Sequence, residues 1–116
     1  MNILVVDDDP DLRETVQAIL EGEGYDTVGA SDGIEAFERL RPGPAPSLIL
    51  LDLMMPRMSG WEFRAAQMVD PKLAGIPVVV MTASSTLSGG AVDVEVLFKP
   101  VPYQTLLETV ARYCRT

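Results

Sequence analysis

The sequence contains no histidine and only one cysteine, which narrows the kinds of site that the chain can build. Zinc and copper sites usually include histidine or cysteine among their ligands. The single cysteine, Cys114, excludes a disulfide within the chain and favours a reducing compartment. Three neighbouring methionines, Met54, Met55 and Met58, therefore do not predict a copper site. Loop packing and a surface for a partner are the better interpretation.

Long apolar runs and basic residues are also scarce. No stretch reaches the roughly 18 apolar residues of a membrane-spanning helix. The first apolar run begins at residue 2 or 3, so we expect no signal peptide before it. Nine basic residues face 17 acidic ones, for a net charge of −8. This charge argues against nucleic-acid or membrane binding by this chain and is compatible with a basic protein partner. Because the single cysteine favours a reducing compartment and we expect neither a membrane-spanning helix nor a signal peptide, we expect a cytoplasmic location.

Apolar runs alternate with helical patterns along the whole chain. With 116 residues and 47% apolar residues, we expect one globular domain, 1–116. The runs predict strands over residues 2–6, 27–30, 48–51, 78–81 and 94–98, of which the first and third are of the buried type. Helical spacing predicts helices that begin at residues 10, 34, 60 and 103. In the third of these helices, the residues expected to face inward are Trp61, Phe63, Ala66 and either Met68 or Val69.

Strands that alternate with helices predict an α/β fold. Strands that are apolar along their whole length are typical of a parallel sheet covered by helices on both faces. Because crossovers between parallel strands are right-handed, few topologies are possible. We expect a doubly wound five-stranded parallel sheet in the order 2-1-3-4-5, in which the first and third strands are neighbours.

Acidic residues follow two of the apolar runs. Asp7, Asp8 and Asp9 come after the first, and Asp52 comes after the third. Neighbouring parallel strands would bring these carboxylates together, and their repulsion favours raised pKa values or a bound hard cation such as Mg²⁺. Asp9 is better interpreted as the N-cap of a helix with Pro10 at its first position. Asp7, Asp8 and Asp52 are therefore the candidate site.

Five short segments occur in a fixed order along the chain: Val5–Asp8, Leu51–Pro56, Ser59-Gly60, Met81–Ala83 and Lys99-Pro100. Together they make the chain similar to the receiver domain of bacterial two-component response regulators. The resemblance covers essentially the whole chain and implies a flavodoxin-like fold. It also implies a cis peptide bond between Lys99 and Pro100.

The resemblance implies a role for each site residue. Asp52 would accept a phosphoryl group from a sensor histidine kinase or a phosphotransfer protein. Asp8 would bind Mg²⁺ directly and Asp7 mainly through water, with the backbone carbonyl of Met54 as a further ligand. Thr82 would donate a hydrogen bond to the phosphoryl group, and Lys99 would pair with it. Mg²⁺ and the lysine would neutralise the charge on the transferred group.

On this interpretation the chain is a phosphoacceptor and not an enzyme in the ordinary sense, although it would have intrinsic phosphotransfer and autodephosphorylation activity. Its output would be contact with a downstream protein target, with phosphorylation-dependent dimerisation as one form of that contact. The alternative is a constitutive protein-interaction module with a vestigial phosphorylation site. A flavodoxin-like cofactor binder is not favoured, because it would need a phosphate-cradling loop after the first strand and the sequence has none there. A phosphatase of the haloacid type is not favoured either, because it would need a second aspartate at the position that Met54 occupies.

One region departs from the family pattern. Only 17 positions separate Thr82 from Lys99, which is short for this family. The segment includes Gly89-Gly90 and several hydroxyl residues, which are poor helix formers. We therefore expect a short or missing fourth helix, with residues 84–93 irregular and mobile. Val96 stands where the family usually has an aromatic residue, so the usual switching pair of threonine and aromatic ring is incomplete.

Overall fold

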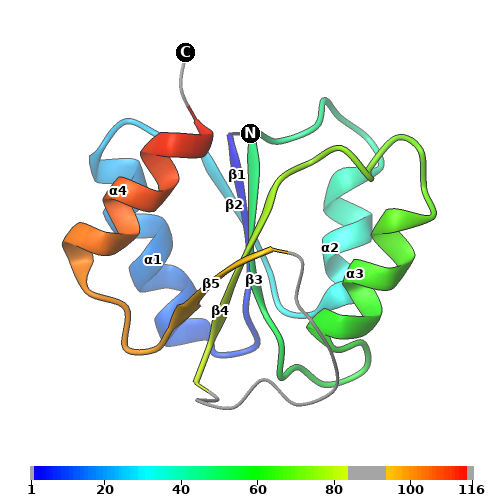
Figure 1. Ribbon diagram of the computed structural model, residues 1–116, viewed down its shortest axis with the longest axis horizontal. Helices are drawn as coiled ribbons and strands as arrows, with labels where there is room; N and C mark the ends of the chain where they lie inside the picture. The colour runs from blue at the N-terminus through cyan, green and yellow to red at the C-terminus, as the bar shows by residue number, and fades with distance from the viewer. Residues whose placement is uncertain (1, 84–93, 115–116) are drawn as a thin grey trace.

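A computed structural model describes residues 2–83 and 94–114 of the chain. Its centre is a five-stranded sheet in the order β2-β1-β3-β4-β5, and every pair of neighbouring strands is parallel. Figure 1 shows helices on both sides of this sheet. The predicted doubly wound fold and its strand order are confirmed.

The strands lie close to their predicted positions. They are β1 (Ile3–Val6), β2 (Thr27–Ala30), β3 (Leu48–Asp52), β4 (Val78–Thr82) and β5 (Glu95–Phe98). The first, third and fourth are buried along their whole length. Burial on both faces explains why these strands are continuous apolar runs rather than alternating patterns.

The helices are α1 (Pro10–Gly22), α2 (Gly33–Leu40), α3 (Gly60–Met68) and α4 (Tyr103–Tyr113). Helices α1 and α4 cover one face of the sheet, and α2 and α3 cover the other (Figure 1). Asp9 is the N-cap of α1, as predicted, and its carboxylate accepts hydrogen bonds from the amides of Asp11 and Leu12. The expected short or missing helix between β4 and β5 falls on residues 84–93, which lie outside the described residues.

The core is divided by the sheet into two apolar layers. Leu4 and Val6 of β1 belong to the layer beneath α2 and α3, whereas Ile3 and Val5 belong to the layer beneath α1 and α4. This alternation follows from the two-residue period of a strand. The two layers thus pack against both faces of the central strands, at whose ends the candidate site residues lie.

The inward face of α3 differs from its prediction. Phe63 is fully buried, but Met68 and Val69 are 47% and 82% exposed. The buried residue in this turn is Gln67, whose Nε2 donates hydrogen bonds to the carbonyl oxygens of Leu73 and Ile76. These carbonyls belong to the turn before β4, and buried backbone groups of a turn need partners from outside a helix or sheet. A polar side chain therefore takes the place expected for an apolar one.

Candidate functional site

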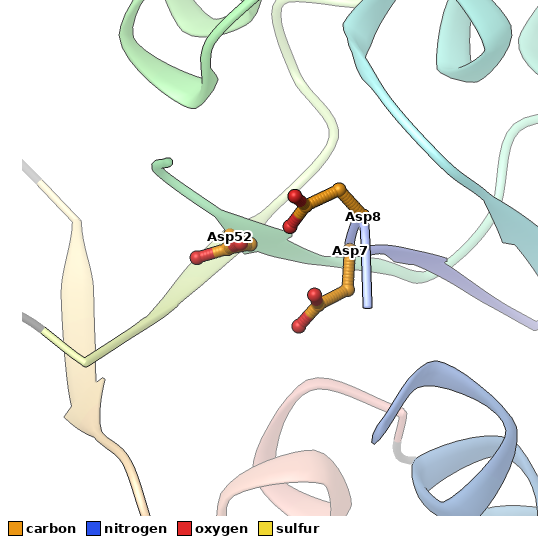
Figure 2. Close-up of side chains that lie close together, drawn as sticks. All are labelled: Asp7, Asp8 and Asp52. Carbon is orange, nitrogen blue, oxygen red and sulfur yellow. The ribbon is translucent and has the colours of Figure 1, made fainter. Parts of the chain in front are cut away.

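Three carboxylates meet at the edge of the sheet where β1 and β3 end. One carboxylate oxygen from each of Asp7, Asp8 and Asp52 lies within 4.8 Å of the other two. Figure 2 shows the three side chains gathered in one place, two from the segment after β1 and one from the end of β3. Asp7 and Asp52 are 1% and 4% exposed, whereas Asp8 is exposed. The sequence prediction that these residues converge is confirmed.

The register of the sheet explains this convergence. Val6 is paired with Leu51 across the β1–β3 ladder, and the next residues are Asp7 and Asp52. The strands β1 and β3 therefore end side by side and point in the same direction. In a doubly wound sheet, this edge between neighbouring strands is the usual position of a ligand site.

Lys99 brings a positive charge into the acidic cluster. Its Nζ lies 2.8 Å from Asp7 Oδ2 and 3.5 Å from Asp52 Oδ1. The residue directly follows β5, and its backbone amide donates a hydrogen bond to the carbonyl oxygen of Thr82. The peptide bond between Lys99 and Pro100 is cis, as expected. The closer partner of Lys99 is Asp7 rather than Asp52, which the sequence did not indicate.

Burial and charge change the acidity of two groups in the site. Burial, and then the neighbouring charge of Asp7, raise the pKa of Asp52 to about 6, although Lys99 partly offsets this increase. Burial alone would lower the pKa of Lys99, but the hydrogen bond to Asp7 and the charge of Asp52 outweigh it and raise that pKa. Two buried carboxylates and one ammonium leave negative charge in excess, so the cluster favours a further cation.

The other two predicted residues lie at the same edge of the sheet. Thr82 is the last residue of β4 and is fully buried, and its neighbour Met81 is paired with Asp52. Met54 lies two residues beyond Asp52 and is 69% exposed, and its amide nitrogen is 3.5 Å from Asp52 Oδ1. Their positions are compatible with the predicted roles, which stay predictions.

Several contacts that shape the site could not be predicted from sequence. Arg13 of α1 donates a hydrogen bond to the carbonyl oxygen of Asp7 at 2.7 Å. Gly60 begins α3, and a Cβ atom there would lie 2.4 Å from the carbonyl oxygen of Asp52. The Ser59-Gly60 motif therefore lets α3 start directly against the strand that carries Asp52. Arg57 pairs with Asp32, although no local pattern connects these residues.

The fold and the acidic site together define a doubly wound protein with a candidate cation site at the ends of β1 and β3. The family model of the response regulator receiver domain matches residues 3–111. The chain belongs to this family. The resemblance carried by the five segments is thereby confirmed.

Known proteins similar to the chain include DNA-binding regulators and isolated receiver domains. The DNA-binding response regulator MtrA of Mycolicibacterium smegmatis is 43% identical over 83 residues, which cover 72% of the chain and 35% of MtrA. The match thus spans about a third of that relative's length. The chemotaxis protein CheY4 of Vibrio cholerae has a similar structure, with a TM-score of 0.85, 31% identity and 97% of each chain covered.

A receiver domain with a metal ion has the same fold. The receiver domain of the sensor histidine kinase PA1611 from Pseudomonas aeruginosa holds a magnesium ion in its active-site cleft. It matches with a TM-score of 0.85 and 23% identity, over 99% of this chain and 98% of that one. Within residues 2–83 and 94–114, none of the helices is long and apolar enough to cross a lipid bilayer.

Proposed function

We propose that Asp52 accepts a phosphoryl group from a sensor histidine kinase or a phosphotransfer protein, and that the phosphorylated domain signals through contact with another protein. The observation that supports this proposal is the arrangement of Asp7, Asp8, Asp52 and Lys99 at one edge of the sheet. We also propose that the domain acts in the cytoplasm, together with this kinase.

Transfer from a phosphohistidine would break the P–N bond and form a bond between phosphorus and a carboxylate oxygen of Asp52. The imidazole would leave with the electron pair of the broken bond and take a proton from water. Loss of the phosphoryl group would follow from attack of water on phosphorus, which breaks the bond to the Asp52 oxygen, regenerates the carboxylate and releases inorganic phosphate. Because little covalent chemistry falls to the protein, positioning and charge neutralisation provide most of the rate enhancement. Lys99 and the hydroxyl of Thr82 are the groups that we assign to the phosphoryl oxygens.

The donor atoms of the cluster fit a small hard cation. Carboxylate oxygens are the ligands that Mg²⁺ prefers, and the ion usually keeps several waters. Asp8 is exposed, whereas both carboxylate oxygens of Asp7 accept hydrogen bonds, from Lys99 and from the amide of Asp9. We therefore assign direct binding to Asp8, Asp52 and the Met54 carbonyl, and an indirect role to Asp7. Bound Mg²⁺ would neutralise charge on the transferred phosphoryl group.

An apolar groove beside the site is a suitable surface for the phosphoryl donor. It has a volume of about 300 Å³, lies between α1 and α4, and is lined by residues that include Leu12, Ile19 and Tyr103. Lys99 also lines it, so the groove is continuous with the acidic site. A donor that carries its phosphohistidine to Asp52 would come close to this part of the surface, because Lys99 belongs to both the groove and the site. We propose that the kinase docks an apolar helix face here.

Incubation with acetyl phosphate and Mg²⁺ tests the proposed chemistry without a kinase. Intact-protein mass spectrometry should show the addition of one phosphoryl group to the wild type and none to Asp52→Asn. Asp11→Asn is the matched control because Asp11 is a nearby aspartate on α1 outside the cluster. Labelling of Asp52→Asn equal to that of wild type would exclude Asp52 as the acceptor.

The alternative, a constitutive interaction module, would also keep the fold but would not need the cluster. The closely spaced carboxylates and their lysine favour the phosphoacceptor. Beryllofluoride, a mimic of the phosphoryl group, separates the two functions. A phosphoacceptor should change its contacts or dimerise when the mimic binds, as measured by light scattering and by NMR. A constitutive module should give the same spectrum and mass with and without the mimic.

A further inference from the structure

The loop from Leu53 to Gly60 connects the acceptor residue to α3 and is closed at its base. The amide of Gly60 donates a hydrogen bond to the carbonyl oxygen of Leu53, so the two ends of the loop are in contact. Ser59 caps α3 in a capping box with Glu62. Both ends are therefore held. The loop also contains Met54, whose carbonyl we assign to the cation.

The tip of this loop has an unfavourable backbone conformation. Arg57 has a φ angle of +62°, and it is the only residue other than glycine with a positive φ in the described part of the chain. The amide of Met58 donates a hydrogen bond to the carbonyl oxygen of Pro56, so Arg57 is the central residue of a three-residue turn. A side chain with a Cβ atom is disfavoured in this conformation, so contacts outside the turn must stabilise it.

Those contacts come from the start of α2. Arg57 Nε lies 2.6 Å from Oδ2 of Asp32, a residue that is 3% exposed. The other oxygen of Asp32 accepts a hydrogen bond from the amide of Glu35 and caps α2. Beside this pair, the amide of Gly33 donates to the carbonyl oxygen of Met58. A Cβ atom on Gly33 would lie 2.6 Å from Met58 Sδ, so the loop packs directly on the helix.

We infer that the ion pair between Arg57 and Asp32 is a clamp that fixes the loop after Asp52 and so positions the Met54 carbonyl for cation binding. Arg57 and Asp32 are positioning residues, because neither belongs to the cluster of carboxylates. The part of this inference that concerns the cation rests on the proposed function. The clamp itself rests only on the contacts of the loop.

Two substitutions remove the clamp in different ways. Arg57→Gly removes the guanidinium but suits a positive φ, so it relieves the backbone strain and should leave global stability near that of wild type. Asp32→Asn keeps an oxygen that can cap α2 but loses the charge that pairs with Arg57. Arg112→Ala is the matched control. It breaks the ion pair with Glu95, the first residue of β5. This strand is the outermost one on the side of the sheet away from β2, the strand that precedes Asp32.

Two measurements on the full chain decide the inference. Hydrogen exchange without metal should be faster at the amides of Gly33 and Met58 in Arg57→Gly and in Asp32→Asn, but not in Arg112→Ala. Calorimetric titration with MgCl₂ should show an affinity roughly tenfold lower in both clamp variants, comparable to the loss of an outer partner at a metal site. The double variant should be no weaker than either single variant, because the two residues act as one unit.

Each outcome has a distinct meaning. Unchanged exchange in both variants would overturn the clamp. Faster exchange with unchanged Mg²⁺ affinity would overturn its link to the cation site. If wild type itself binds no Mg²⁺, the proposed cation site is wrong, and exchange still decides whether the clamp holds the loop. A lower affinity in Arg112→Ala as well would indicate a general loss of stability rather than positioning.

Discussion

Asp52 is a buried acid beside another acid, so its charged form is unfavourable in the folded protein. Its pKa is about 6, above the ordinary value of 3.8. At pH values between these two pKa values, the folded state binds more protons than the unfolded chain. The contribution of Asp52 to the free energy of unfolding therefore falls as pH rises. The same cost at neutral pH is what a bound cation would relieve. Metal binding and folding stability should therefore be linked through this residue.

We expect Asp52→Asn to be more stable than wild type at pH 7 in the absence of metal, by roughly 1 to 3 kcal/mol. The difference should shrink as pH falls through 6 and vanish near 4, because wild type is then protonated at this position in the folded state. Urea denaturation across this pH range, with chelator present, measures the difference. Equal stability of the two proteins at pH 7 would contradict the raised pKa.

Lys99 is the counterion of the cluster in the metal-free protein. We expect Lys99→Met to lower the free energy of unfolding at pH 7 by about 1 to 3 kcal/mol, because two buried carboxylates then lack their partner. Saturating Mg²⁺ should restore part of this loss, since it binds only the folded state. Lys72→Met, at an exposed lysine away from the cluster, is the control. Thermal unfolding with and without Mg²⁺ measures both effects, and a Lys99→Met variant as stable as wild type would contradict this role.

At the scale of elements, the proposed docking groove between α1 and α4 is largely distinct from the residues that we assign to the chemistry. This groove is apolar and borders the site through Lys99, but most of its lining lies outside the acidic cluster. Substitutions in the groove should therefore affect a protein donor and leave a small-molecule donor unaffected. This difference provides a test of docking that does not depend on the chemistry of Asp52.

Tyr103 is the most suitable residue for that test, because it lines the groove and is 56% exposed. We expect Tyr103→Ala to slow phosphotransfer from a sensor kinase about tenfold, as loss of an aromatic contact at an interface commonly does. Labelling by acetyl phosphate should stay unchanged. Val69→Ala, an exposed residue at the end of α3, is the control. The kinase used would be the one that labels wild type fastest in a panel, and equal rates for Tyr103→Ala and wild type would exclude this docking surface.

At the scale of the whole molecule, the net charge of −8 opposes DNA binding by this chain, although the chain is similar to part of a DNA-binding regulator, MtrA. Affinity for DNA depends mainly on cations that contact phosphates. We expect the chain by itself to show no binding to fluorescein-labelled duplex DNA in anisotropy titrations at about 50 mM salt, where electrostatic binding is strong. Phosphorylation adds negative charge and should not change this result. Saturable binding that weakens with salt would contradict the prediction.

Much of the fold could be predicted from the sequence, because local patterns are sufficient for its main elements. Apolar runs and their alternation with helical spacing predicted the strands and helices of the described residues. The cap at Asp9-Pro10 depends on a few neighbouring residues, so it could also be predicted. The carboxylates at the ends of β1 and β3 converge because parallel strands in adjacent positions end at the same edge of the sheet. The sequence by itself thus determined the fold class and the candidate site.

Tertiary structure decided the features that depend on contacts between distant segments. Gln67 is buried because the carbonyls of a later turn need hydrogen-bond donors, which no helical periodicity reveals. Lys99 lies closer to Asp7 than to Asp52, although β3 and β4 stand between β5 and β1 in the sheet. Arg57 has a positive φ, and its guanidinium pairs with Asp32, 25 residues earlier. Such pairings join residues that are far apart in sequence, and only the packed sheet and its helices bring them together.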